Sequence, residues 1–513
     1  MKEKTEGVGR KRKDVVTPNT PRKSAPVAVC GTGIPGLDDI LAGGLTADRL
    51  YLAEGVPGSG KTTLALQFLL EGVRLGQPVL FVTLSESAEE LRAVAASHGW
   101  RLDGVEIREL LPSGELLRPD DQYTIFHPSE VELAETTRSI LDWVERSKPV
   151  RVVLDSLSEL RLLSGTPLRF RRQILALKQF FVGRRCTVLF LDDMTSEDRD
   201  LQVQSIAHGV LLLDQLSPDY GTERRRLRVV KYRGVRFRGG HHDFVIRRGG
   251  LEVFPRLVAS GHPSSGVLEK LPSGVKALDT LLGGGIERGT STLIAGAAGT
   301  GKSTLAAQFA CSAADLGQEA AFFIFDEGIH TLVSRADGLG IPLEKHIREG
   351  RVTVRQVSPA ELSPGELTHS IRRAVEERQV SVVVIDSLNG YLNAMPGERF
   401  LIVQLHEMLT YLGQKNIATI LVSAHQGLIG ARMDSPVDAS YLADAVILMR
   451  YFEAEGEVRQ AISVMKKRGG AHERTIREFR MTDGKIGIGP PLREFRGILT
   501  GVPVYDGKKR RGR

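Results

Sequence analysis

The feature that most constrains this chain is a glycine-rich loop that occurs twice. GVPGSGKTT runs from Gly55 to Thr63, and GAAGTGKST runs from Gly296 to Thr304. Both match the pattern GxxxxGK[ST], in which glycines allow backbone N–H groups to turn inward onto phosphate oxygens. In this pattern the lysine reaches the β- and γ-phosphates of a nucleotide, and the Ser or Thr hydroxyl binds Mg²⁺.

A chance glycine-rich turn is the alternative for a single match. Two complete matches, each expected between a strand and a helix, favour two sites for ATP and Mg²⁺. The predicted ATP-binding residues are those of the two loops: Gly55, Gly58, Ser59, Gly60, Lys61, Thr62, Thr63, Gly296, Gly299, Thr300, Gly301, Lys302, Ser303 and Thr304.

The spacing between the loops shows that the repeat is much longer than the loops themselves. Lys302 minus Lys61 is 241, and the same offset joins Asp38 to Asp279. Later in the copies the offset is 231 to 235, which small loop insertions and deletions explain. A period above 200 residues indicates two whole domains rather than a solenoid.

Each copy alternates short apolar runs such as PVLFVTL and VSVVVID with segments of helical spacing. This pattern predicts an α/β fold, with a mostly parallel sheet covered by helices on both faces. We expect a basic tail over 1–29, domains over 30–257 and 271–497, a linker over 258–270, and a second basic tail over 498–513.

Composition narrows the class of protein. The 513 residues include 41% hydrophobic residues and only 3 widely spaced cysteines, which argues against a disulfide framework or a zinc site. No apolar run is long enough to span a bilayer and no signal-peptide core is present, so we expect a cytoplasmic protein without a membrane partner. The net charge of the chain is +7, and much of its basic character lies in the tails. We interpret these tails as solvated segments, and contact with a nucleic acid or an acidic partner is the alternative.

Carboxylates are expected to complete each site. Asp155 and Asp386 end buried strands and are the predicted water-mediated partners of Mg²⁺, with helix N-caps as the alternative. Glu86 and Glu327 follow the strand after the loop helix, where a side chain can activate the attacking water. The alternative for these two is an ordinary acid at a helix start.

With these motifs in this order, the chain resembles the KaiC family within the RecA-like ATPases over about residues 30–500. FVTLSES, FFIFDEG, VVLDSLSEL, VVVIDSLNGY, KYRGVRF and KKRGGAHERTIREF carry the resemblance. It implies two tandem RecA-like P-loop NTPase domains and homohexamers that bind ATP at subunit interfaces. It further implies that a Lys-x-Arg pair in each domain reaches the neighbour's γ-phosphate: Lys231 and Arg233, and Lys466 and Arg468. A solvated basic strand end is the alternative.

The chain departs from the family at three points. The family's paired glutamates become Ser85-Glu86 in the first copy and Asp326-Glu327 in the second, so Asp326 joins the predicted catalytic acids. The family's Ser-Thr phosphoacceptors become Ser440-Tyr441, which leaves Ser440 as the candidate acceptor. After Thr500 only GVPVYDGKKRRGR follows, so the activator that grips the longer tail of clock proteins is not expected to bind.

The function predicted from these features is an ATPase with Ser/Thr autokinase activity in the second domain, serving signalling or timing with an unknown partner. A RecA-like DNA-dependent ATPase of the recombination or helicase type is the alternative, and DNA-stimulated hydrolysis would distinguish it. A scaffold whose nucleotide sites act as assembly switches is a third reading.

Overall fold

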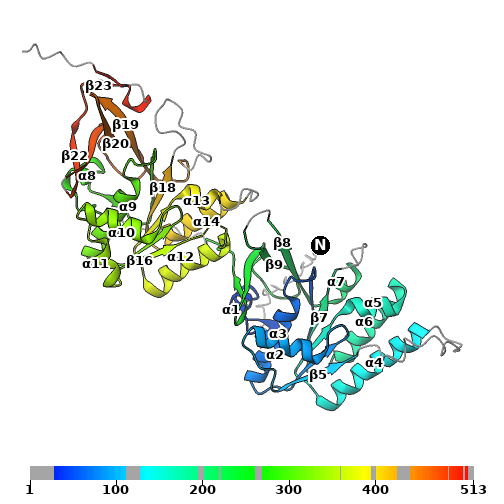
Figure 1. Ribbon diagram of the computed structural model, residues 1–513. Helices are drawn as coiled ribbons and strands as arrows, with labels where there is room; N and C mark the ends of the chain where they lie inside the picture. Colours follow the sequence, from blue (N-terminus) through cyan, green and yellow to red (C-terminus); the bar gives the residue numbers. More distant parts are fainter. Residues whose placement is uncertain are drawn as a thin grey trace, which may run out of the picture.

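The computed structural model describes residues 28–110, 128–194, 201–218, 221–259, 269–358, 360–393, 400–424, 440–482, 484–500 and 503–505. These residues form two α/β halves, coloured from blue to green and from green to red in Figure 1. A nine-stranded sheet lies at the centre of each half. The predicted fold class, two tandem α/β domains with mostly parallel sheets, is confirmed.

The first half opens with a small strand pair and a helix. Its elements before the first glycine-rich loop are β1 (Val29–Cys30), α1 (Pro35–Ile40), β2 (Leu45–Thr46) and β3 (Leu50–Gly55). The elements that follow are α2 (Lys61–Arg74), β4 (Val79–Thr83), α3 (Ala88–Ser97), β5 (Val105–Glu109), α4 (Pro128–Ser147), β6 (Arg151–Asp155), α5 (Leu157–Ser164), α6 (Pro167–Phe181), β7 (Thr187–Asp192), α7 (Leu201–Ile206), β8 (Gly209–Leu216), β9 (Arg224–Tyr232), β10 (His242–Arg247) and β11 (Gly250–Phe254).

The second half repeats this order. It contains β12 (Lys270–Leu271), α8 (Lys276–Leu281), β13 (Ile286–Glu287), β14 (Ser291–Gly296), α9 (Lys302–Asp315), β15 (Ala320–Ile324), α10 (Ile329–Gly338), α11 (Leu343–Arg348), β16 (Val352–Gln356), α12 (Pro364–Arg378), β17 (Val382–Asp386), α13 (Leu388–Asn393), α14 (Leu401–Gln414), β18 (Ala418–Ala424), β19 (Ala445–Ala454), β20 (Glu457–Lys467), β21 (Arg477–Thr482) and β22 (Lys485–Pro491). A short pair, β23 (Phe495–Arg496) and β24 (Val504–Tyr505), flanks the 3₁₀ helix η2 (Ile498–Thr500) and extends into the predicted C-terminal tail.

The two sheets have the same topology. The first has the order β11-β10-β9-β8-β3-β7-β6-β4-β5, and the second, read from its other edge, has β22-β21-β20-β19-β14-β18-β17-β15-β16. Strands β3 to β8 are parallel and β9 to β11 continue the sheet antiparallel. The loop-bearing strands β3 and β14 therefore lie in the interior of their sheets.

Alternating side chains on the parallel strands divide the core into two layers. On β6, Val153 faces the layer that contains α1, α2 and α3, whereas Val152 and Leu154 face the layer of α4, α5, α6 and α7. Successive side chains of a strand point to opposite faces, so a strand covered on both faces is apolar throughout. This explains why the buried strands lack the alternating polar pattern of a half-exposed sheet.

Helix ends follow from local sequence. Thr166 caps α6 by accepting from the Arg169 N–H, with Pro167 in the first turn, and Ser363 caps α12 in the same way before Pro364. Among the described helices, none is long and apolar enough to cross a membrane. The basic tail before residue 28 and most of the predicted linker lie outside the described residues.

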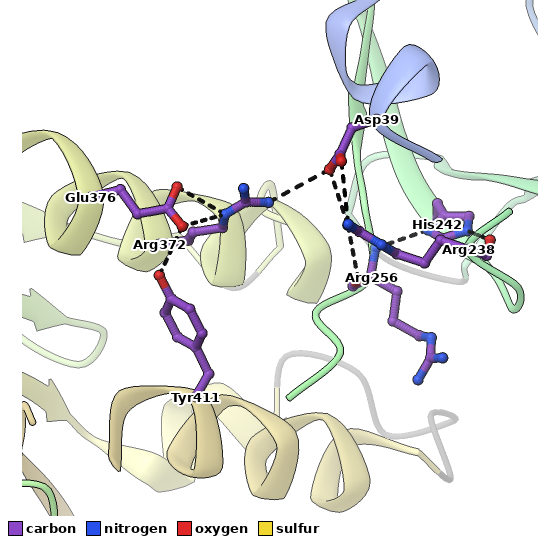
Figure 2. Close-up of polar contacts among 7 residues, drawn as sticks. All are labelled: Asp39, Arg238, His242, Arg256, Arg372, Glu376 and Tyr411. Atoms are coloured by element: carbon purple, nitrogen blue, oxygen red, sulfur yellow. Dashed lines mark hydrogen bonds and ion pairs between the residues drawn. The ribbon is translucent and has the colours of Figure 1, made fainter. Parts of the chain in front are cut away.

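The two halves touch where α12 lies against β10, β11 and the end of α1 of the first half (Figure 2). The Asp39 carboxylate of α1 pairs with Arg238 at 3.1 Å and with Arg372 of α12 at 3.8 Å. Arg372 also pairs with Glu376 at 3.0 Å, and Glu376 accepts a hydrogen bond from the Tyr411 hydroxyl at 3.1 Å. A polar junction therefore connects residues that are hundreds of positions apart in the sequence.

Candidate functional site

The first glycine-rich loop connects β3 to α2 in a conformation that requires glycine. Gly60 has φ 99° and a Cβ there would lie 2.7 Å from Cδ1 of Ile246. A Cβ at Gly55 would lie 2.4 Å from the Leu213 carbonyl oxygen. Lys61 begins α2 with its side chain buried, and its ammonium donates to the Gly55 and Val56 carbonyls at 2.9 and 3.1 Å. The loop is a tight cradle with a buried cation at its base.

The second loop has the same geometry between β14 and α9. Gly301 has φ 96°, and a Cβ at Gly296 would lie 2.3 Å from the Met449 carbonyl oxygen. Lys302 is buried and donates to the Ala297 carbonyl at 2.7 Å. Burial lowers the pKa of the Lys302 ammonium to about 8, because the charged form is poorly solvated there. An anion in the loop would compensate for that loss of solvation.

A hydroxyl and a carboxylate meet beside each lysine. The Thr62 hydroxyl donates to Oδ2 of Asp155, the last residue of β6, at 3.2 Å. In the second copy the Ser303 hydroxyl lies beside Asp386, the last residue of β17, and lowers the pKa of that carboxyl. Ser156, not Asp155, occupies the N-cap of α5, so the structure does not favour the N-cap alternative for Asp155. The peptide bond after each of these aspartates is cis.

The environment of these aspartates fits a divalent cation. Burial raises the pKa of Asp155 to about 7, and nearby Glu86 and Asp193 add to the rise. Burial likewise raises the pKa of Asp386 to about 6. Oδ2 of Asp386 is buried and has no hydrogen-bond partner among the described residues. Hydroxyl and carboxylate oxygens are the ligands that Mg²⁺ prefers, and a cation would relieve the cost of burying these groups.

The predicted catalytic acids differ between the copies. In the first copy, Glu86 follows β4, and its Oε2 is buried without a partner among the described residues. Burial raises the pKa of Glu86, with Glu90 and Asp193 contributing further. Glu86 precedes the N-cap of α3, which is Ser87, so it is not one of the acids in the first turn of that helix.

In the second copy both acids are engaged. Asp326 accepts a hydrogen bond from the Ser387 hydroxyl. The two carboxylate oxygens of Glu327 accept from the Arg335 guanidinium of α10 at 2.7 and 2.8 Å. In the first copy the position that corresponds to Arg335, 241 residues earlier, is Val94, which cannot form such an ion pair. Arg335 is absent from the sequence prediction.

The sequence prediction also missed Asp193. Asp193 directly follows β7, which is the neighbour of β3 in the sheet. Its Oδ1 lies 2.9 Å from the Lys61 ammonium. The doublet Asp192-Asp193 at the end of an apolar run was the available signal. Asp192 pairs with Arg161 and is buried, whereas Asp193 faces the loop.

The predicted trans cations lie at equivalent bulges. The register of strand pairing shifts just before Lys231 on β9 and just before Lys466 on β20. On the partner strands the shift falls between Val210 and Leu211 of β8 and between Val446 and Ile447 of β19. The Lys231 ammonium donates to the carbonyls of Gln204, Ser205 and Ala207, and Arg233 donates to Ser205.

Lys466 donates to the carbonyls of Ser440 and Ala443 at 3.0 and 2.7 Å. Arg468 pairs with Asp444 and donates to the Tyr441 carbonyl. Ser440 therefore lies next to one predicted trans cation through its backbone. Contact of these cations with a neighbouring subunit's nucleotide stays a prediction.

No group of three or more His, Cys, Asp or Glu residues within the described ranges is arranged to hold a metal ion. The three cysteines are free and buried. The loop pattern implies that a cation at either loop shares its coordination with phosphate oxygens.

Comparison with known proteins agrees with this geometry. The family model described as "ATPase: KaiC" matches residues 30–258 and 271–493, one match for each half. The chain is 28% identical over 487 residues to the circadian clock protein KaiC3 of Synechocystis sp., covering 92% of this chain and 94% of that protein. It is 29% identical over 498 residues to the circadian clock oscillator protein KaiC of Thermostichus vulcanus, covering 94% and 93%. The corresponding protein of Picosynechococcus sp. is 28% identical over 485 residues, covering 92% of each chain.

Proposed function

The chain belongs to the KaiC family of ATPases, and on this premise we propose that it binds ATP with Mg²⁺ at both glycine-rich loops and hydrolyses it. The observation that carries the proposal is the same arrangement in both copies: a buried loop lysine, a hydroxyl, and a carboxylate at the tip of the strand two places away in the sheet. Membership of this family makes the alternative of a DNA-dependent recombinase or helicase the less favoured reading.

Each loop would hold the nucleotide by its phosphates. The backbone N–H groups of the loop and the N-terminus of α2 or α9 supply donors to the phosphate oxygens, and Lys61 or Lys302 supplies the positive charge. Thr62 with Asp155, and Ser303 with Asp386, would hold Mg²⁺. When bound, Mg²⁺ neutralises charge that develops on the transferring phosphoryl group.

In the first domain, Glu86 is the proposed general base. Its buried carboxylate has an oxygen without a partner in the described part of the chain, and the upward shift of its pKa makes it a better proton acceptor when it is ionised. It would accept the proton of the water that attacks the γ-phosphate. Because the neighbouring position is Ser85 rather than a second acid, we expect slow turnover.

In the second domain, we place an autokinase reaction at Ser440. Its hydroxyl oxygen would form the bond to the γ-phosphorus, the bond from that phosphorus to the β–γ bridging oxygen would break, and ADP would leave. Asp326 or Glu327 would accept the hydroxyl proton. The hydrogen bond from Lys466 to the Ser440 carbonyl supports a position of this serine near a predicted trans cation.

We further propose that the chain assembles into a homohexamer with nucleotides between subunits, in which Lys231, Arg233, Lys466 and Arg468 reach the neighbour's phosphates. Cations placed across an interface stabilise charge in the transition state. The names of the relatives favour a role in signalling or timing.

Counting bound nucleotides tests the proposal. We expect two Mg-ATP per chain in the wild type and one in each of Lys61→Ala and Lys302→Ala, because each lysine is the main cation of its own loop. Ring assembly, measured by light scattering, should weaken in both variants, because the binding energy that favours the closed ring is lost. Two nucleotides per chain in both variants would refute the model.

A further inference from the structure

We propose that Asp193 sets the nucleotide affinity of the first site by competing with phosphate for Lys61. The inference rests on the proposed function, in that the first loop must be a nucleotide site. It goes beyond it by naming a residue that makes the two sites unequal. None of the roles given above to the loop residues requires an acid at position 193.

The Lys61 ammonium is fully occupied. An ammonium has three N–H donors. In this structure they meet the Gly55 carbonyl at 2.9 Å, the Val56 carbonyl at 3.1 Å and Oδ1 of Asp193 at 2.9 Å. A phosphate oxygen that binds Lys61 must therefore replace one of these acceptors.

Asp193 is the acceptor that phosphate would replace. The two carbonyls belong to the loop backbone, which is fixed by glycines whose Cβ positions are blocked. The Asp193 side chain is 30% exposed, against 6% for Lys61, so it can rotate toward solvent. It is also the only one of the three acceptors that carries a charge, and its departure costs the ion pair.

At the second site, the position equivalent to Asp193 holds no acid. The offset of 231 places Ala424 at the position of Asp193 and Asn389 at the position of Ser158. The backbone geometry is equivalent, because the Asp193 N–H donates to Ser158 Oγ and the Ala424 N–H donates to Asn389 Oδ1. A methyl group cannot pair with Lys302, whose ammonium donates to the Ala297 carbonyl.

Nearby charges increase the effect. Asp193 raises the pKa of both Glu86 and Asp155, although burial is the larger cause for each. Three carboxylates thus act on one another at a site whose loop cation is Lys61. Bringing phosphates to this site requires Lys61 to leave Asp193 and adds like charge beside it. The first site should bind nucleotide more weakly than its loop alone would allow.

The test measures dissociation constants for Mg-ADP and a non-hydrolysable Mg-ATP analogue by calorimetry on the purified full chain. In a Lys302→Ala background, Asp193→Asn should tighten binding at the first site about tenfold, which corresponds to about 1.4 kcal/mol. The reciprocal variant Ala424→Asp, in a Lys61→Ala background, should weaken the second site by a similar factor. Thermal unfolding of each nucleotide-free variant reports whether it is folded.

Unchanged or weaker binding by a folded Asp193→Asn would overturn the inference and would mean that Asp193 helps to hold the nucleotide complex. If Asp193→Asn does not fold, Ala424→Asp decides alone, and unchanged affinity there would overturn it. Failure of the proposed function would look different. If the first loop is not a nucleotide site, the Lys302→Ala protein would bind no nucleotide, and adding Lys61→Ala would change nothing.

Discussion

Single side chains distinguish the two nucleotide sites more than their loops do. The two loops share the pattern GxxxxGK[ST] and nearly the same backbone angle, with φ of 99° at Gly60 and 96° at Gly301. The charges around them differ, because Asp193 pairs with the loop lysine of the first site and Arg335 clamps the glutamate of the second. The ion pair of the first site occupies the loop lysine, and the ion pair of the second site occupies the glutamate.

Arg335 is expected to restrain the second site. A bidentate arginine occupies both oxygens of a carboxylate and fixes its position, so the carboxylate must leave the arginine before it can accept a proton. Arg335→Gln, in a Lys61→Ala background, should raise the kcat of the second domain by roughly tenfold while nucleotide affinity stays within about twofold. Steady-state kinetics with a parallel binding measurement checks this, and Arg335→Lys serves as the conservative control. A lower kcat in Arg335→Gln would mean that the clamp holds Glu327 in its working position.

Glu86 should act on turnover and not on binding. Glu86→Gln keeps the shape of the side chain but removes the oxygen that accepts a proton, so hydrolysis in the first domain should fall by about 10²–10⁴. The measurement is ATPase rate in a Lys302→Ala background, with the dissociation constant of the nucleotide as the control. Unchanged turnover would exclude Glu86 as the base.

At the scale of strands and helices, much of the site follows from the sequence. The order of strand, glycine-rich loop and helix places Lys61 and Lys302, and apolar strands ending in aspartate place Asp155 and Asp386. The pairing of Asp193 with Lys61 was not predictable in this way, because it needs β7 to lie beside β3 although more than 130 residues separate these strands in sequence. The Arg335–Glu327 pair likewise depends on the orientation of α10 relative to Glu327, which the spacing of the two residues in the sequence does not give.

The hairpin of β10 and β11 is an element whose importance the sequence did not indicate. It contacts the loop helix, because the Leu251 N–H donates to Oε1 of Gln67 at 2.7 Å. His242 of β10 is fully buried: its Nε2 donates to the Arg238 carbonyl at 2.9 Å and its Nδ1 accepts from the Arg256 N–H at 2.8 Å (Figure 2). This arrangement needs a neutral imidazole.

His242 predicts a pH dependence of stability. Burial lowers its pKa from 6.5 to about 4; the cations Arg238 and Arg256 also disfavour protonation, while the Arg238 hydrogen bond and Asp243 oppose the shift. Between these two pH values the unfolded chain binds a proton that the folded chain does not, so stability is complete above about pH 6.5 and falls as the pH drops toward 4. The loss reaches at most about 3 kcal/mol.

Urea unfolding across this pH range provides the measurement. His242→Gln should be less stable than wild type at pH 7 and should show a shallower pH slope. The same change at exposed His330 is the control and should leave the slope unaltered. An unchanged slope in His242→Gln would assign the pH dependence to other groups.

Across the whole molecule, the hairpin also links the first domain to the second. Arg247 of β10 pairs with Glu366 of α12, and the Gly365 N–H donates to Asp243 at 2.8 Å. The Phe254 and His369 rings lie 5.2 Å apart across the same junction. A cavity of about 310 Å³ opens here, lined by Arg247, Glu366, Arg373 and Glu377 among others. The same hairpin therefore packs on the helix of the first loop and on the helix that precedes β17 and Asp386.

The pair Arg247–Glu366 is expected to hold this junction. Glu366 is 5% exposed, so Arg247→Met leaves a buried carboxylate without its guanidinium and should cost about 1–3 kcal/mol. Arg373→Met is the matched control, because Arg373 lines the same cavity but pairs with Glu377 where both side chains are more than half exposed. Its effect should stay within about 0.5 kcal/mol. Calorimetric unfolding of the nucleotide-free chain measures both variants. Equal small effects would mean that the Arg247–Glu366 pair adds little to stability.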